Sequence, residues 1–116
     1  MKILIIEDEE ASLEQMIQWL TLESYEVFSA SDSVVAVSEA FRLKPDIIIC
    51  DLVTLLVADF DVFRALRESS GTARTPLIFM CTFSNPNEVK QGDNNNCLYK
   101  PFSRLDLLEA LRIAGM

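Results

Sequence analysis

The chain has 116 residues, half of them hydrophobic, and carries a formal net charge of −8. This length predicts one compact domain, residues 1–116, large enough to bury a core on both faces of a sheet. The acidic balance argues against direct binding of nucleic acid or of an anionic membrane, since both require a basic surface. No apolar run has the length of a membrane span or the position of a secretory signal, so we expect a cytoplasmic protein.

Strand and helix patterns alternate along the first half of the chain. Residues 2–6 predict a strand, and the acids after it lead into a helix with an apolar face. That face is formed by Leu13, Met16, Ile17 and Leu20. A second strand is predicted at 25–28, and Ser31-Asp32-Ser33 supplies the cap of the next helix. The inward residues of that helix are expected to be Val34, Val37 and Phe41.

The middle of the chain continues the alternation. Lys44-Pro45 ends the second helix, and residues 46–50 form an apolar strand suited to burial on both faces. A third helix is expected from near Asp59 to the Ser69-Ser70-Gly71 stretch. Its apolar side is predicted to carry Phe60, Phe63 and Leu66. Residues 77–81 are an unbroken apolar run, which predicts a central parallel strand.

The last third contains one weak and one strong helix signal. Asn85-Pro86 is typical of a helix start, but Val89 is the only apolar residue before 91–96, so this helix is expected to be very short. A short strand ends at Tyr99. Ser103 and Asp106 then predict a capping box for the final helix. Its apolar stripe is expected to be Leu105, Leu108 and Leu111.

Five strand–helix units in succession predict an α/β fold. Right-handed crossovers would place helices on both faces of a five-stranded parallel sheet. The doubly wound strand order 2-1-3-4-5 is expected at this size. In that order the first, third and fifth strands end around one crevice.

Charged side chains stand at the ends of those three strands. Glu7 and Asp8 follow the first strand, Asp51 follows the third, where we expect it exposed at the rim of the sheet, and Lys100 follows the fifth. Two such carboxylates about 4 Å apart repel by roughly 4 kcal/mol at an effective dielectric of 20. Lys100 offsets part of this repulsion, and a hard divalent cation with oxygen ligands, such as Mg²⁺, would offset the rest. The next acids, 9 and 10, are expected to be solvated at a helix N-terminus.

The absence of histidine and the positions of the cysteines limit which kinds of catalytic or metal site the chain can form. Histidine is absent, which removes imidazole chemistry and most transition-metal sites. The cysteines at 50, 81 and 97 fall in predicted strands without metal-ligand spacing, and we expect buried, reduced thiols.

The chain has an acidic pair after the first strand, an aspartate after the third and a Lys-Pro-Phe after the fifth. In this it resembles the receiver domains of bacterial two-component response regulators, over essentially the whole chain. The resemblance implies a flavodoxin-like receiver fold in which Asp51 accepts a phosphoryl group from a histidine kinase or phosphotransfer protein. It implies Mg²⁺ bound by Asp8 and Asp51, by Glu7 through water, and by the backbone carbonyl of Val53. It also implies a cis Lys100-Pro101 bond, and a switch acting on an output partner or fused effector domain rather than a metabolic enzyme.

Several positions depart from the pattern of that family. Leu55 and Asp59 stand where the loop after the phosphoacceptor usually has proline and glycine. Cys97 stands where an aromatic residue is usual, although Tyr99, two residues on, could face the same side of its strand. In the family, a hydroxyl residue senses the phosphoryl group. Residue type assigns this role to Thr82, whereas the usual spacing from the phosphoacceptor assigns it to Cys81, and we favour Thr82.

The segment between Thr82 and Lys100 is also shorter than usual, by about one helical turn of 3.6 residues. The resemblance therefore implies a shortened fourth helix and an atypical output surface. We expect residues 84–96 to be the least stable part of the domain.

Three other functions compete with a phosphorylated receiver. A pseudo-receiver would use the fold as a protein-interaction module independent of phosphorylation, which the missing proline, glycine and aromatic residue favour. A flavodoxin-like cofactor site is disfavoured because the acids at 7–10 would repel a phosphate. A phosphatase or nuclease with paired acids is disfavoured because no second acid follows Asp51 by two residues.

Overall fold

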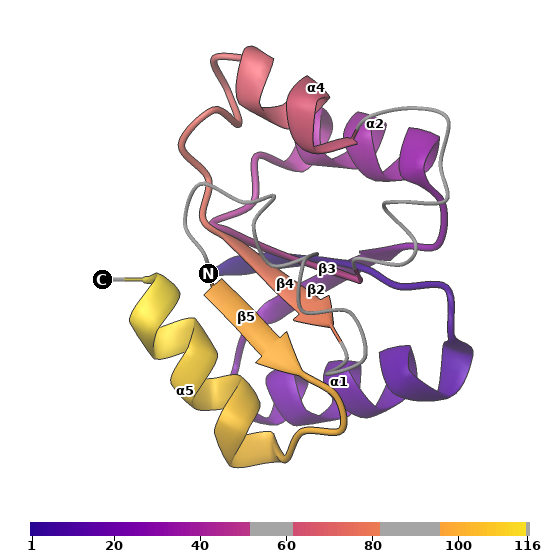
Figure 1. Ribbon diagram of the computed structural model, residues 1–116, viewed down its shortest axis with the longest axis vertical. Helices are drawn as coiled ribbons and strands as arrows, with labels where there is room; N and C mark the ends of the chain where they lie inside the picture. Colours follow the sequence, from indigo (N-terminus) through magenta and orange to yellow (C-terminus); the bar gives the residue numbers. More distant parts are fainter. Residues whose placement is uncertain (52–61, 82–95, 116) are drawn as a thin grey trace.

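The computed structural model describes residues 1–51, 62–81 and 96–115. Within these ranges the chain forms a five-stranded parallel sheet in the order β2-β1-β3-β4-β5 between two layers of helices (Figure 1). The strands are β1 (Lys2–Ile6), β2 (Glu26–Ala30), β3 (Ile47–Asp51), β4 (Leu77–Cys81) and β5 (Asn96–Tyr99). The predicted doubly wound α/β fold and its strand order are confirmed.

The described helices lie on both faces of this sheet (Figure 1). They are α1 (Glu10–Leu22), α2 (Ser33–Leu43), α4 (Val62–Glu68) and α5 (Arg104–Ala114). Helices α1 and α5 cover one face, and α2 and α4 cover the other. This is the arrangement that right-handed crossovers between parallel strands produce.

Each face of the sheet has its own hydrophobic core. The core on the α1 and α5 face is built from Ile3, Ile5, Met16, Leu20, Ile47, Ile49, Ile78, Met80, Leu98, Leu107 and Leu111. The core on the α2 and α4 face includes Leu4, Ile6, Ala36, Val37, Ala40, Leu43, Ile48, Cys50, Leu66, Leu77, Phe79 and Cys81. Every residue of β3 and β4 is buried, because these inner strands are covered on both faces and paired on both edges.

Capping residues in the sequence place the helix ends where we predicted them. The Asp32 carboxylate accepts a hydrogen bond from the backbone N–H of Val35 at 2.8 Å, which caps α2. At its other end, Lys44 has the left-handed φ of 49° that closes a helix before Pro45. Ser103 and Asp106 form the predicted capping box of α5.

The predicted inward faces of two helices are partly wrong. Val34 and Phe41 are 66% and 43% exposed, and α2 instead buries two alanines with Val37 and Leu43. Leu105 is 68% exposed, whereas Leu107 is fully buried. Small residues let α2 approach the sheet closely, so the larger apolar side chains beside them remain on the solvent side.

Some strand boundaries also shift by one or two residues, as the spans of β2, β3 and β5 show. The predicted start of the third helix near Asp59, with Phe60, lies outside the described residues. So does the short helix predicted from Asn85. Among the helices of the described ranges, none combines the length and hydropathy that crossing a bilayer requires.

Candidate active site at the carboxyl edge of the sheet

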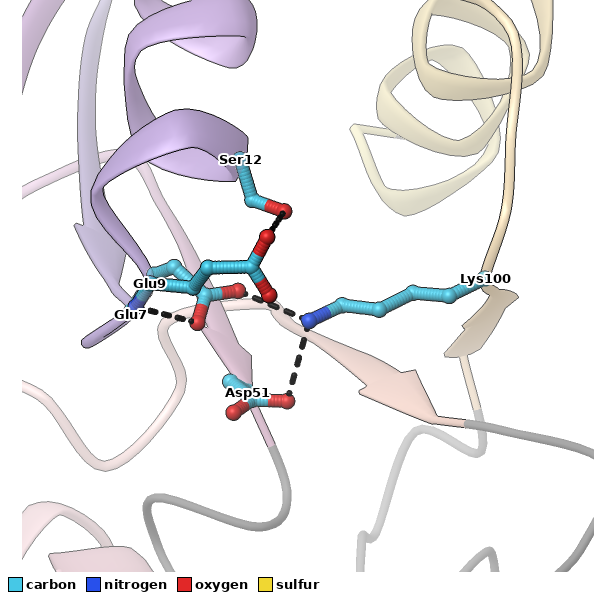
Figure 2. Close-up of polar contacts among 5 residues, drawn as sticks. All are labelled: Glu7, Glu9, Ser12, Asp51 and Lys100. Atoms are coloured by element: carbon cyan, nitrogen blue, oxygen red, sulfur yellow. Dashed lines mark hydrogen bonds and ion pairs between the residues drawn. The ribbon is translucent and has the colours of Figure 1, made fainter.

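The four charged residues predicted at the strand ends come together in the structure. Ile6 of β1 pairs with Cys50 of β3, so the next residues, Glu7 and Asp51, emerge side by side. The backbone N–H of Glu7 donates to the carbonyl of Ala30 at 3.1 Å, which holds the start of the loop against β2. Lys100 directly follows β5 and reaches across the edge toward both acids (Figure 2).

Lys100 bridges the two buried carboxylates. Its Nζ donates to Glu7 Oε2 at 2.8 Å and to Asp51 Oδ1 at 3.4 Å (Figure 2). Glu7 is 1% exposed and Asp51 is 6% exposed. Asp51 therefore lies at the expected edge but is buried, contrary to the exposed position we expected, and the Lys100 ammonium compensates its charge.

The electrostatics of Lys100 follow from this contact. Burial disfavours its charged form, but the hydrogen bond to Glu7 and the negative charges of Asp51 and Glu7 outweigh burial. The pKa of Lys100 is therefore raised above its ordinary value. The site keeps a fixed positive charge between two acids throughout the physiological pH range.

The second carboxylate oxygen of Glu7 also accepts a hydrogen bond. Glu7 Oε1 accepts a hydrogen bond from the backbone N–H of Glu9 at 3.0 Å. Glu9 itself is exposed at the N-cap of α1, and its carboxylate accepts a hydrogen bond from the Ser12 hydroxyl at 3.3 Å (Figure 2). Glu10 is exposed as well, so both acids lie at the helix N-terminus as expected.

Three carboxylates at this edge fit a hard divalent cation. One oxygen each from Glu7, Asp8 and Asp51 lies within 4.8 Å of the others. Asp8 is exposed, unlike the other two, so it is the acid that is open to an arriving ion. Carboxylate oxygens that leave room for water are the donor set that Mg²⁺ prefers.

Other expected site residues fall on different parts of the chain. Val53 and Thr82 lie outside the described residues. Cys81 is the last residue of β4 and is buried in the α2 and α4 core. Tyr99 and Cys97 pack against that same core, so they share a face of β5 as anticipated. The peptide bond between Lys100 and Pro101 is cis, as expected.

Sequence reasoning missed a hollow that borders the site. This hollow has a volume of about 450 Å³ and is lined by Ser12, Gln15, Met16, Trp19, Lys100, Pro101 and Phe102. The rings of Trp19 and Phe102 have centroids 6.4 Å apart. The sequence does contain a signal for this hollow in its two aromatic residues. Trp19 stands beside the predicted apolar face of α1, and Phe102 belongs to the Lys-Pro-Phe motif.

Fold and site together define a doubly wound α/β domain with a lysine-bridged acidic cluster at the carboxyl edge of its sheet. The model of the response regulator receiver domain family matches residues 3–112, and the chain belongs to that family. The identification made from the strand-end residues is confirmed. Receiver domains are the phosphoacceptor switch domains of two-component signalling, and they bind Mg²⁺ at an acidic site.

Relatives and solved structures agree with this assignment. The chain is 30% identical over 114 residues to the DNA-binding dual master transcriptional regulator RpaA of Synechocystis, covering 96% of this chain and 47% of RpaA. It is equally similar to the response regulator PleD of Caulobacter vibrioides, of which it covers 25%. The chain thus spans half or less of the length of these relatives.

Two solved structures illustrate the fold and the site. The chemotaxis response regulator CheY4 of Vibrio cholerae superposes with a TM-score of 0.86 at 27% identity, covering 97% of each chain. The receiver domain of sensor histidine kinase PA1611 from Pseudomonas aeruginosa PAO1 superposes with a TM-score of 0.78 at 26% identity, covering 99% of this chain and 98% of that one. That receiver domain has a magnesium ion coordinated in its active-site cleft.

Proposed function

We propose that Asp51 accepts a phosphoryl group from a histidine kinase or phosphotransfer protein and that the modified domain changes its binding to an output partner. The observation that carries this proposal is the bridge from Lys100 to Asp51 and Glu7 beside the exposed Asp8. A carboxylate nucleophile, a fixed cation and a cation-binding acid pair are the groups that phosphoryl transfer requires.

The residues have distinct roles in this proposal. The Asp51 carboxylate attacks phosphorus, a bond from its oxygen to phosphorus forms, and the bond from phosphorus to the donor nitrogen or acyl oxygen breaks. Asp8 and Asp51 would hold Mg²⁺, Glu7 would act through water, and the carbonyl of Val53 would be a further ligand. Mg²⁺ supplies neutralisation of charge on the transferring group. The Lys100 ammonium supplies a second positive charge.

The hydroxyl of Thr82 is proposed to sense the phosphoryl group, with Cys81 as the alternative. The packing of Cys81 within the α2 and α4 core supports a structural role for its thiol. Comparison of the Thr82→Ala and Cys81→Ser variants by NMR with beryllofluoride distinguishes the two. Loss of the activation shifts in Cys81→Ser alone would reverse the assignment.

The hollow beside Lys100 gives the phosphodonor protein a place to dock. It has an apolar wall that includes Trp19 and Phe102, and Lys100 lines both the hollow and the phosphoacceptor site. A protein surface seated there would contact Lys100, which donates a hydrogen bond to Asp51. The remaining parts of the proposal are a cytoplasmic location, a single domain over 1–116 with no metabolic activity of its own, and an output partner or effector domain still to be identified.

Intact mass spectrometry tests the proposal directly. Incubation with Mg²⁺ and acetyl phosphate or phosphoramidate is expected to add one phosphoryl group to the protein. Asp51→Asn removes this modification, and Asp8→Ala weakens Mg²⁺ binding, which isothermal titration calorimetry measures. A phosphoryl group gained equally fast by Asp51→Asn would refute the assignment.

A pseudo-receiver is the second candidate, because Leu55, Asp59 and Cys97 replace residues usual in the family. It predicts that phosphorylation is slow or that a phosphoryl group on the protein leaves partner binding unchanged. Intact mass, together with partner binding compared with and without the phosphodonor, separates the two functions.

A further inference from the structure

The Lys100 ammonium contacts its two acids unequally. Its Nζ lies 2.8 Å from Glu7 Oε2 but 3.4 Å from Asp51 Oδ1, so the attraction to Glu7 is the stronger of the two. Lysine carries its charge on a long, flexible stem. Attraction to Glu7 alone therefore leaves the distance from the ammonium to Asp51 free to vary, and the placement of the Lys100 stem has to fix that distance.

The backbone of Lys100 is held by the end of the neighbouring strand. Its N–H donates to the carbonyl of Cys81, the last residue of β4, at 2.8 Å. Ser103, three residues further along the chain, is the N-cap of α5. The residues between these two points, Pro101 and Phe102, line the same hollow as the side chains of α1. The connection from β5 to α5 therefore runs along α1.

Helix α1 supplies the surface against which this connection packs. The rings of Trp19 and Phe102 have centroids 6.4 Å apart and planes inclined by 57°, which is within the range of favourable aromatic pairs. Both side chains are partly buried against the core on the α1 and α5 face. Lys100 borders the same hollow as Trp19 and the buried Met16. The aromatic pair thus lies beside the lysine that bridges the two acids.

The same helix holds the acid at the other end of the bridge. The backbone N–H of Glu9, the N-cap of α1, donates to Glu7 Oε1 at 3.0 Å. Helix α1 is therefore connected to Glu7 at its N-terminal end and, through Trp19 near its C-terminal end, to the connection that carries Lys100. One helix sets the relative position of the acid and the lysine.

We propose that Trp19 is a positioning residue that keeps the Lys100 ammonium within reach of Asp51 during phosphoryl transfer. The indole acts through Phe102, which belongs to the same connection as Lys100. This inference rests on the function proposed above for Asp51 and leaves the bond changes of that reaction as described. A misplacement of about 1 Å can lower a rate roughly 100-fold, and we expect loss of the indole to slow the reaction about 5- to 20-fold.

The test is the rate at which the protein gains a phosphoryl group from a small donor in excess Mg²⁺, followed by intact mass. Trp19→Ala and Phe102→Ala are expected to slow the reaction to a similar extent, and Trp19→Phe, which keeps a ring, to retain most of the wild-type rate. A small donor does not dock as a protein does, so weaker protein docking cannot account for the loss. Acetyl phosphate and phosphoramidate should give the same fold-change, because the donors differ only in the leaving group.

A double-mutant cycle with Lys100→Met separates positioning from a general structural role. Trp19→Ala should cause no further loss of rate in the Lys100→Met background, because no ammonium is left to position. Arg104→Met is the matched control. The ion pair of Arg104 with Glu23, at 3.0 Å, also joins α5 to α1, and its loss should leave the phosphorylation rate unchanged.

The possible results distinguish this inference from the proposed function. A wild-type protein that gains no phosphoryl group overturns both. A phosphorylated wild type overturns the positioning role alone if Trp19→Ala reacts equally fast, if Trp19→Ala causes the same loss with and without Lys100, or if Arg104→Met is slowed as much. A loss confined to acetyl phosphate also overturns it, because the indole would then contact the acyl group. Phe102→Ala carries the same cycle if Trp19→Ala does not fold.

Discussion

Replacing Lys100 by methionine tests how strongly its ammonium holds the site together. The change removes the charge and keeps most of the side-chain length, which leaves the carboxylates of Glu7 and Asp51 buried beside each other. At an effective dielectric of 20, an ion pair at the 2.8 Å separation of Lys100 and Glu7 is worth roughly 6 kcal/mol before desolvation is counted. Breaking a buried pair costs about 3–5 kcal/mol.

The net effect is expected to be smaller, because the Lys100 side chain is 24% exposed and water screens part of the interaction. We therefore predict that Lys100→Met lowers the free energy of unfolding by about 2–3 kcal/mol in the absence of divalent cations. Urea unfolding at neutral pH with a chelator present, followed by circular dichroism, measures this difference.

Arg104→Met is the matched control. Arg104 also forms a long-range ion pair, with Glu23 at 3.0 Å, but both side chains are at least 40% exposed. Its loss should change stability by less than about 1 kcal/mol. Adding Mg²⁺ should stabilise Lys100→Met more than the wild type, because the variant has lost its internal cation. Equal, small losses in the two variants would show that Lys100 does not compensate the buried acids.

Three further predictions concern stability. Leu107→Ala should cost about 2–5 kcal/mol and Leu105→Ala less than about 0.5, because only Leu107 is buried; equal losses in urea unfolding would contradict the observed face of α5. Arg67→Ala should cost about 2–3 kcal/mol, since Arg67 Nη1 donates to three backbone carbonyls between residues 72 and 75, and unchanged thermal unfolding would count against this role. Burial, and then the charge of Asp51, raise the pKa of Cys50 from 9.0 to about 12. The stabilisation from the protonated Cys50 thiol should be complete below pH 9. Between pH 9 and pH 12 it should decline by about 1.4 kcal/mol per pH unit, because the unfolded state loses the proton first. A difference in the free energy of unfolding between wild type and Cys50→Ala that stays constant over this range would refute this prediction.

The sequence was sufficient to predict the sheet and the meeting of the charged residues. Apolar runs identify the strands, and parallel strands all end at one edge, so Glu7, Asp51 and Lys100 had to converge once the strand order was known. The burial of Asp51 could not be predicted in this way. It depends on the position of the flexible Lys100 side chain, which is determined only once the site is assembled.

The inward faces of the helices were harder to predict. Residues 105, 108 and 111 are spaced by three, and each step falls about 60° short of a full turn, so they cannot all face the sheet. Leu107 and Leu111 are separated by only about 40° and are both buried. In α2, the prediction chose the large apolar residues Val34 and Phe41 as inward-facing. The buried stripe instead contains the smaller residues Ala36 and Ala40.

The position of the two central acids has a consequence for how the domain opens. Glu7 and Asp51 extend from β1 and β3, inner strands with a neighbour on either side. Fraying at the edges of the sheet leaves the paired carboxyl ends of β1 and β3 together. Lys100 offsets part of the repulsion between the two carboxylates, and the remainder persists until β1 and β3 separate. Amide protons at the ends of β1 and β3 should therefore exchange through global unfolding, and any cation that binds between the acids should slow their exchange to the same extent as it slows exchange in the core.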